Sequence, residues 1–196
     1  MRHFLTAAFL VCLIISIGPA QSKMAWGVGL ELAAPMGTFG DVANMGFGGT
    51  GRFEYQLQNN LALTATVGYL AWGGKEVTIQ TSTGIFGSTV KSTIDYSSIP
   101  IKAGIKYYFS GGFYGMGEAG IHMFSTDVKT VSTVTSASGT KVTEETGTGS
   151  STEFTIAPAV GYELKAGNMI VDLSARYEII SDLSFLGFRA GLKFAL

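Results

Sequence analysis

Residues 97–109 read SSIPIKAGIKYYF, and this stretch decides the fold class. Two lysines, Lys102 and Lys106, lie on one side of an alternating pattern. Apolar side chains occupy the other side, at Ile99, Ile101, Ala103, Ile105, Tyr107 and Phe109. A period of two residues is typical of a β-strand with one polar and one apolar face. The stretch therefore predicts a strand, and it leaves open which face meets water.

The composition is that of a hydrophobic chain with few charges. Of its 196 residues, 46% are hydrophobic and 14% are charged, and the formal net charge is −1. This length suits one domain or two small ones. The 27 glycines recur inside alternating segments, which is typical of tightly curved strands. No basic cluster occurs in the sequence, so we expect no nucleic-acid partner.

Residues 1–22 have the pattern of a secretory signal peptide. A basic residue precedes an apolar run from Phe4 to Ile17, and small residues follow it. We expect cleavage after Ala20 or Ser22, which leaves residues 23–196 as the mature domain. The apolar run is short for a membrane-anchoring helix, the alternative interpretation.

The only cysteine, Cys12, lies inside this apolar run. A lipoprotein signal requires a small residue directly before its cysteine, whereas Val11 precedes Cys12. We therefore expect no lipid anchor, and a mature chain without disulfides or thiol chemistry.

The alternation of the first stretch recurs along the whole chain. Each segment has roughly 10–12 residues, the length that a tilted strand needs to cross a bilayer and about twice that of an ordinary strand. With the stretch at 97–109, the segments are 26–32, 47–57, 61–72, 113–124, 154–164, 169–180 and 186–196. They predict an all-β fold, an eight-stranded antiparallel up-and-down transmembrane β-barrel.

The connections between the segments alternate in length. Short turns such as QNN and SGG contrast with long regions at residues 73–97 and 125–153. Short periplasmic turns and long extracellular loops are typical of outer-membrane barrels. We expect residues 73–97 to form a hairpin that continues its strands, and residues 125–153 to form a mobile loop with frayed strands at its base.

The charged residues of the eight segments share one face. Six are acidic and six are basic, so their charges sum to zero. A closed interior requires such a balance, because an unpaired buried charge is costly. A soluble eight-stranded barrel would instead place its apolar face inside. We predict an interior charge network of Glu31, Arg52, Glu54, Lys102, Lys106, Glu118, Glu163, Asp172, Arg176, Glu178, Arg189 and Lys193.

Aromatic residues gather near the two ends of the predicted strands. Such girdles mark the two interfaces of a membrane. One group is Tyr55, Tyr107, Phe109, Phe113, Tyr162 and Phe194, and the other is Phe47, Tyr69, Phe154 and Tyr177.

Turn positions predict specific neighbours inside the barrel. A two-residue loop at 182–183 would put Asp172 opposite Lys193, and Arg176 opposite Arg189. In the same way, a turn near Gly111 would put Glu118 opposite Gly104.

Taken together, the segments resemble the small outer-membrane β-barrels of Gram-negative bacteria, the OmpA/OmpX-like superfamily. The resemblance covers residues 24–196 and is carried by SSIPIKAGIKYYF, YGMGEAGIHMF and GFRAGLKFAL. It implies a monomer in the outer membrane, in contact with lipopolysaccharide and without cofactor or metal. It also implies a C-terminal signal for the barrel-assembly machinery, formed by Arg189, Gly191, Phe194 and Leu196. Leu196 departs from the phenylalanine that is usual at the last position.

The resulting hypothesis is a non-enzymatic surface protein for adhesion, another interaction or envelope integrity. An extracellular ligand would contact the loops 73–97 and 125–153. One alternative is a narrow channel or a path for small hydrophobic molecules, and the expected lack of large apolar residues on the inner face counts against the latter. The other is a lipid A-modifying enzyme, which would need His122 as its base. We expect His122 instead to be a hydrogen-bonded interior histidine.

Overall fold

The computed structural model describes residues 23–83, 86–136, 139–181 and 183–196, so the predicted signal peptide lies outside the described residues. The described residues form nine strands and one short helix. Their bounds are β1 Met24–Met36, α2 Gly37–Val42, β2 Ala43–Gln58, β3 Leu61–Gly74, β4 Val77–Thr83, β5 Phe86–Ser110, β6 Phe113–Ser136, β7 Gly139–Ala166, β8 Met169–Ile180 and β9 Leu183–Ala195. No helix among them has the length and apolarity needed to cross a membrane.

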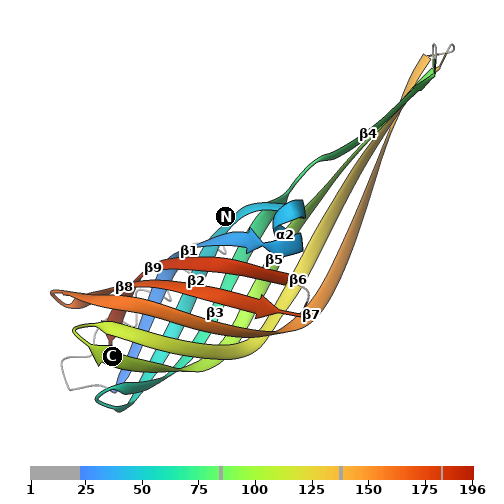
Figure 1. The fold of residues 1–196 in the computed structure, drawn as a ribbon. Helices are drawn as coiled ribbons and strands as arrows, with labels where there is room; N and C mark the ends of the chain where they lie inside the picture. The colour runs from blue at the N-terminus through green and yellow to red at the C-terminus, as the bar shows by residue number, and fades with distance from the viewer. Residues whose placement is uncertain (1–22, 84–85, 137–138, 182) are drawn as a thin grey trace, which may run out of the picture.

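Eight strands form a closed antiparallel ring (Figure 1). Neighbours in sequence are neighbours in the sheet, β1 pairs with β9, and β3 pairs with β5. The ninth strand, β4, pairs with β5 and follows β3 after a break at Lys75 and Glu76. The predicted eight-stranded up-and-down barrel is therefore confirmed, and β4 continues its third strand.

The two ends of the barrel differ. At one end, here called the turn end, two-residue turns join β2 to β3, β5 to β6 and β7 to β8. Gly111 and Gly112 have φ angles of 60° and 95°, a region that glycine adopts without strain. The described chain begins and finishes at this end, where the Leu196 amide donates to the Met24 carbonyl over 3.0 Å.

At the other end, four strands continue beyond the ring as a twisted sheet (Figure 1). We call this sheet the extension, and it consists of residues 77–83, 86–96, 125–136 and 139–150. The hairpin predicted for residues 73–97 is confirmed. The loop predicted for residues 125–153 is wrong, because β6 and β7 stay paired from Ser125 with Ser150 to Ser136 with Gly139. Threonine is the most frequent residue of this segment, which also holds four valines, and both residue types favour strands.

The distribution of apolar side chains is the reverse of that in a water-soluble protein. Leu30 is 77% exposed and Phe47 is 68% exposed, whereas Lys106 and Glu178 are completely buried. Buried charges and an exposed apolar belt are typical of a barrel that faces lipid outside.

Small residues leave room for the buried charges. Gly104 lies opposite Glu118, as the turn at Gly111 predicted. A Cβ atom at Gly104 would lie 2.8 Å from Cγ of Glu118 and 2.2 Å from the Gly117 carbonyl oxygen. Close approach of the two strands therefore requires glycine here.

Large apolar side chains fill the interior near the extension, so the expectation that the inner face lacks them is wrong. They form a cluster, here called the aromatic plug, of Phe39, Leu70, Trp72, Phe124, Ile180 and Phe185. The ring centroids of Trp72 and Phe185 are 5.3 Å apart, and those of Trp72 and Phe39 are 5.6 Å apart. Phe39 comes from helix α2, an element that strand patterns do not predict.

Candidate functional site

All twelve residues of the interior charge network point into the barrel. Eleven of them are buried, and the side chain of Glu163 is 9% exposed. They come from seven strands of the ring and form three layers along the barrel axis.

The layer nearest the turn end pairs two glutamates with two lysines. Lys106 and Lys193 each lie 2.9 Å from a carboxylate oxygen of Glu54, and each also contacts Glu163. The Tyr108 hydroxyl donates to Glu163 over 3.1 Å and to Glu54 over 3.3 Å. Four strands are thereby connected across the interior.

The middle layer is centred on Asp172. Its Oδ2 atom lies 3.0 Å from Nη1 of Arg52 and 2.8 Å from Nη1 of Arg189, and its Oδ1 atom accepts from the Tyr114 hydroxyl. One carboxylate thus connects β2, β6, β8 and β9. Arg189 also donates to the Thr50 hydroxyl over 2.9 Å.

The predicted register between the last two strands is wrong by two residues. Lys193 lies opposite Ile170, and Arg189 lies opposite Ser174. Ile180 pairs with Leu183, so the connection is one residue closer to β8 than expected. A shift by two keeps every side chain on its face. All the charges therefore stay inside, with different partners.

The third layer is centred on Glu178. It contacts Lys102, and its Oε1 atom lies 2.7 Å from Nε of Arg176. Arg176 also contacts Glu31, and Lys102 lies 3.6 Å from Glu118. Every carboxylate of the network thus has a cation beside it.

His122 lies between this layer and the aromatic plug, and it is completely buried. Its Nδ1 atom lies 3.1 Å from the Ser98 hydroxyl, and its Nε2 atom lies 3.5 Å from Oε2 of Glu178. The ring stacks on Phe124 with centroids 5.5 Å apart. The Ser98 hydroxyl and the Glu178 carboxylate thus lie at the two ring nitrogens of His122, and the aromatic plug covers this group.

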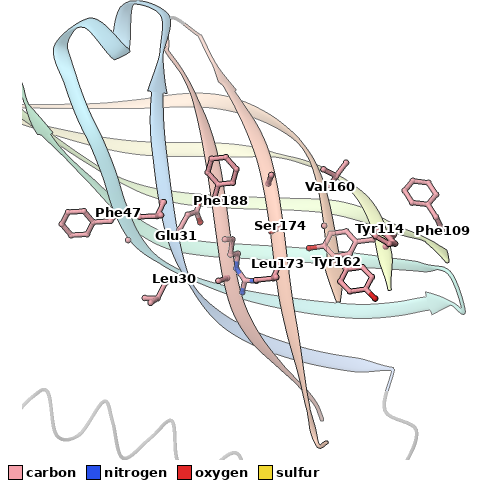
Figure 2. Close-up of a pocket in the computed structure, with 17 residues that line it drawn as sticks. Leu30, Glu31, Phe47, Phe109, Tyr114, Val160, Tyr162, Leu173, Ser174 and Phe188 are labelled. Carbon is pink, nitrogen blue, oxygen red and sulfur yellow. The ribbon is translucent and has the colours of Figure 1, made fainter. Parts of the chain in front are cut away.

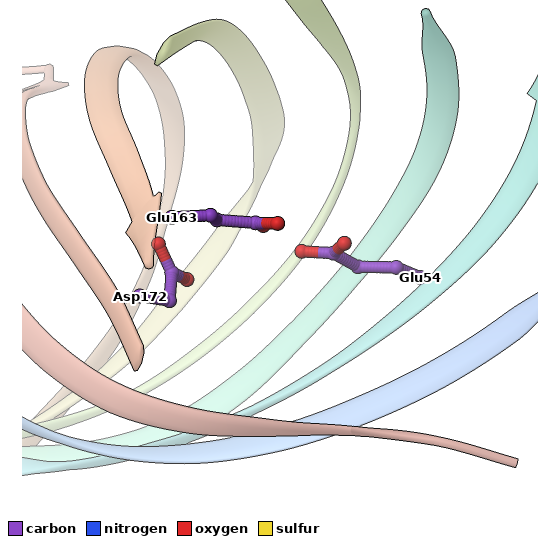
Figure 3. Close-up of side chains that lie close together, drawn as sticks. All are labelled: Glu54, Glu163 and Asp172. Carbon is purple, nitrogen blue, oxygen red and sulfur yellow. The ribbon is translucent and has the colours of Figure 1, made fainter. Parts of the chain in front are cut away.

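Three carboxylates, those of Glu54, Glu163 and Asp172, approach one another closely in the interior (Figure 3). Their ligand atoms lie within 4.8 Å, a spacing at which a metal ion can bind. Each of them, however, already contacts lysine or arginine. These cations neutralise the cluster, so its charge is explained without a metal.

The outer surface carries the apolar belt. A hollow of about 940 Å³ is lined by residues of β1, β2 and β5 to β9, among them the inward-pointing Glu31, Tyr114 and Arg189. Leu30, Phe47 and Phe109 project away from the ribbon there (Figure 2). These exposed apolar side chains belong to the belt, so the part of the hollow that they line faces the lipid.

The residues expected in the girdles lie at the two ends of the belt. Tyr55 pairs with Met24 beside the turn end, while Tyr69 and Tyr177 lie toward the extension. Phe113 and Tyr162 contact each other at 4.4 Å between ring centroids, and Phe194 stacks on Trp26 at 5.2 Å.

In the extension β7 is exposed, many side chains of β5 and β6 are half-buried, and the sheet carries surface ion pairs. Lys91 lies 3.0 Å from Glu76, and Lys129 lies 2.8 Å from Glu144. The hydrogen bond from Lys91 lowers the pKa of Glu76, and the hydrogen bond to Glu144 raises the pKa of Lys129. Sequence reasoning predicted the part of this sheet formed by β4 and β5 and missed the part formed by β6 and β7.

Comparisons with known proteins agree with this architecture. The profile of a family described as outer membrane protein beta-barrel domain matches residues 5–195. The structure is similar to that of Ail, the attachment invasion locus protein of Yersinia pestis, with a TM-score of 0.51 at 11% identity, over 89% of this chain and 99% of Ail. Ail in complex with the heparin analogue sucrose octasulfate gives the same TM-score and coverage at 13% identity.

A weaker similarity is found to the N-terminal β-barrel domain of Pseudomonas aeruginosa OprF. Its TM-score is 0.42 at 12% identity, over 89% of this chain and all of that domain. Comparison with curated protein sequences finds no significant match. At these identities the two Ail structures show a shared fold.

Proposed function

The chain belongs to the outer membrane protein beta-barrel domain family, and from this premise we propose that it is a non-enzymatic surface protein that acts through its extension. The outer-membrane location predicted from the sequence is confirmed by this membership. The turn end then faces the periplasm, and the extension stands outside the cell.

One observation carries the proposal, namely the free edge of β7 in the extension. Strand β8 pairs with β7 from Thr155 downward, so residues 139–153 have no ladder partner on that side in the described part of the chain. Such an edge presents unpaired N–H and C=O groups, which bind another extended strand by β-augmentation. The barrel anchors this edge at the cell surface.

A channel has less support. The three charged layers cross the interior, and the aromatic plug covers them on the extracellular side. An eight-stranded barrel is just wide enough for its own side chains. A path for hydrophobic molecules would in addition need a way past Trp72 and Phe185, which are 1% and 0% exposed.

One observation favours the enzyme hypothesis: His122 lies between the Ser98 hydroxyl and the Glu178 carboxylate. A nucleophile activated in this way must reach its substrate. Ser98 and His122 are buried beneath the plug, and Glu178 is already bound to Lys102, so we interpret the group as structural. His122→Ala is expected to leave lipid A unchanged by mass spectrometry, and an altered lipid A would support the enzyme hypothesis instead.

We also propose that the chain is a monomer in contact with lipopolysaccharide and is assembled by the barrel-assembly machinery. Phe194 and Gly191 suit the proposed C-terminal signal, since both lie on the last strand of the ring. In the folded barrel, the side chain of Arg189 is buried against Asp172. Recognition of Arg189 would therefore precede folding.

The register of the extension allows a clean test. Val77 lies opposite Ser92, and Thr130 lies opposite Glu145. Residues 78–91 and 131–144 are each replaced by Asn-Gly, which supports a two-residue hairpin turn. The trimmed protein should keep heat-modifiable migration on SDS gels, and bacteria that carry it should lose adhesion to cultured cells and to one another. Full adhesion by a correctly folded trimmed protein would contradict the proposed function.

A further inference from the structure

The outer part of the free edge of β7, residues 139–147, carries two charges without an ion-pair partner among the described residues. They are Lys141 and Glu145, and both are exposed. Glu144, between them, is different because it pairs with Lys129 on β6. This outer part of the edge therefore offers one cation and one anion, four residues apart.

These two charges lie on the same face of the sheet. Along β7, Lys141 lies opposite Val134, Thr143 opposite Ser132, and Glu145 opposite Thr130. In a strand, residues two and four apart share a face. Lys141, Thr143 and Glu145 thus form a row at the edge, with the threonine at its centre.

Such a row is complementary to itself. If a second β7 edge lies antiparallel and its Thr143 is opposite Thr143 of the first, each Lys141 comes opposite a Glu145. Two cross-strand pairs of opposite charge form in this register, and such pairs stabilise a sheet. Every residue also stays on its own face.

The direction of the strand decides where the second copy must be. In every copy, β7 runs from the tip of the extension toward the membrane. Two copies in one membrane therefore present parallel β7 strands, and an antiparallel pair requires copies in two membranes that face each other. Thr143 lies ten residues above Glu153, so the membranes would be up to about 65 Å apart at about 3.3 Å per residue.

We propose that the β7 edge pairs with the β7 edge of a second copy on a facing outer membrane, in the antiparallel register centred on Thr143. The inference rests on the proposed function, which it narrows to a specific partner. Charged residues on an edge are also a common protection against strand pairing. If Lys141 and Glu145 only protect the edge, association should not depend on which charges face each other at these two positions.

The test uses purified full-length protein in two populations of lipid vesicles that carry donor and acceptor dyes. Vesicle association, measured by energy transfer, is expected for the wild-type protein. Lys141→Glu places Glu opposite Glu, and Glu145→Lys places Lys opposite Lys. Each single variant should weaken association about tenfold, because two attractive pairs become repulsive.

Two combinations should restore association. Vesicles with Lys141→Glu should associate with vesicles carrying Glu145→Lys, since every facing pair is then again opposite in sign. The double variant Lys141→Glu/Glu145→Lys should associate with itself. Lys91→Glu and Glu76→Lys change the net charge equally away from the edge, and both should behave as wild type.

Wild-type vesicles that stay separate would overturn the inference, as would single variants that associate normally or combinations that fail to restore association. The proposed function is tested separately by the trimmed protein on cells. If trimming abolishes adhesion while vesicles stay separate, the edge binds another partner. If trimming leaves adhesion intact, the proposed function itself is wrong.

Discussion

The carboxylate of Asp172 on β8 lies 3.0 Å from the guanidinium of Arg52 on β2, a contact between residues 120 positions apart. Arg189 on β9 holds the same carboxylate at 2.8 Å. One aspartate thus binds two arginines that reach it from different sides of the barrel. The loss of one charged side chain should therefore destabilise the folded barrel.

Asp172→Asn should destabilise the barrel by about 3–5 kcal/mol, because it leaves buried arginines without their carboxylate. The measurement is urea unfolding in lipid vesicles, followed by tryptophan fluorescence. Asp127→Asn is the control, since Asp127 is exposed on the extension, and its effect should stay within about 0.5 kcal/mol. Equal effects of the two variants would contradict the assignment of Asp172 to a closed interior.

Gly161→Ala should destabilise the barrel by about 1–3 kcal/mol through overpacking. Its Cβ atom would lie 2.3 Å from Cζ of Tyr114, which would displace the hydroxyl that donates to Asp172. Gly117→Ala is the matched control, because a Cβ atom there has nothing within 4 Å. If the two variants have the same unfolding midpoint, Tyr114 does not pack against Gly161 as the structure shows.

The pKa of Glu76 should rise toward that of a free glutamate in Lys91→Ala, because the hydrogen bond from Lys91 lowers it. A lowered pKa in the folded state means that the pair stabilises the extension above the unfolded pKa, about 4.3. This contribution is lost as the pH falls through the folded pKa. NMR titration of the Glu76 carboxyl carbon measures the shift, and an unchanged pKa in the variant would exclude the pair in solution.

The sequence predicted the ring well because alternation along each strand is a local property. Alternate residues of a strand point to opposite faces, so the pattern alone puts Lys102, Lys106 and Asp172 on the polar face. The balance of acids and bases predicted that this face lines a closed interior. Partners were harder to predict, since they depend on the turns. At β8 and β9, a turn displaced by one residue moved Lys193 from Asp172 to Ile170.

Two features of the structure were not predicted from the sequence, for different reasons. Leu70 and Trp72 are on the same face of β3 as Thr64 and Thr66, so the strand pattern already indicated that they point inward. The aromatic plug also depends on Phe39, which lies in a helix that the strand pattern does not predict. The extension of β6 and β7 was concealed by its content of serine, threonine and glycine, which is also typical of loops.

The central claim is that the lysines of SSIPIKAGIKYYF point into the barrel and its isoleucines face lipid. Single cysteines at positions 99, 101, 102, 103, 105 and 106 in a Cys12→Ser background can carry a spin label, whose collision rate with oxygen in the bilayer measures exposure to lipid. The structure predicts high rates at 99, 101, 103 and 105 and low rates at 102 and 106. High rates at the lysine positions, or rates without a period of two, would contradict the account.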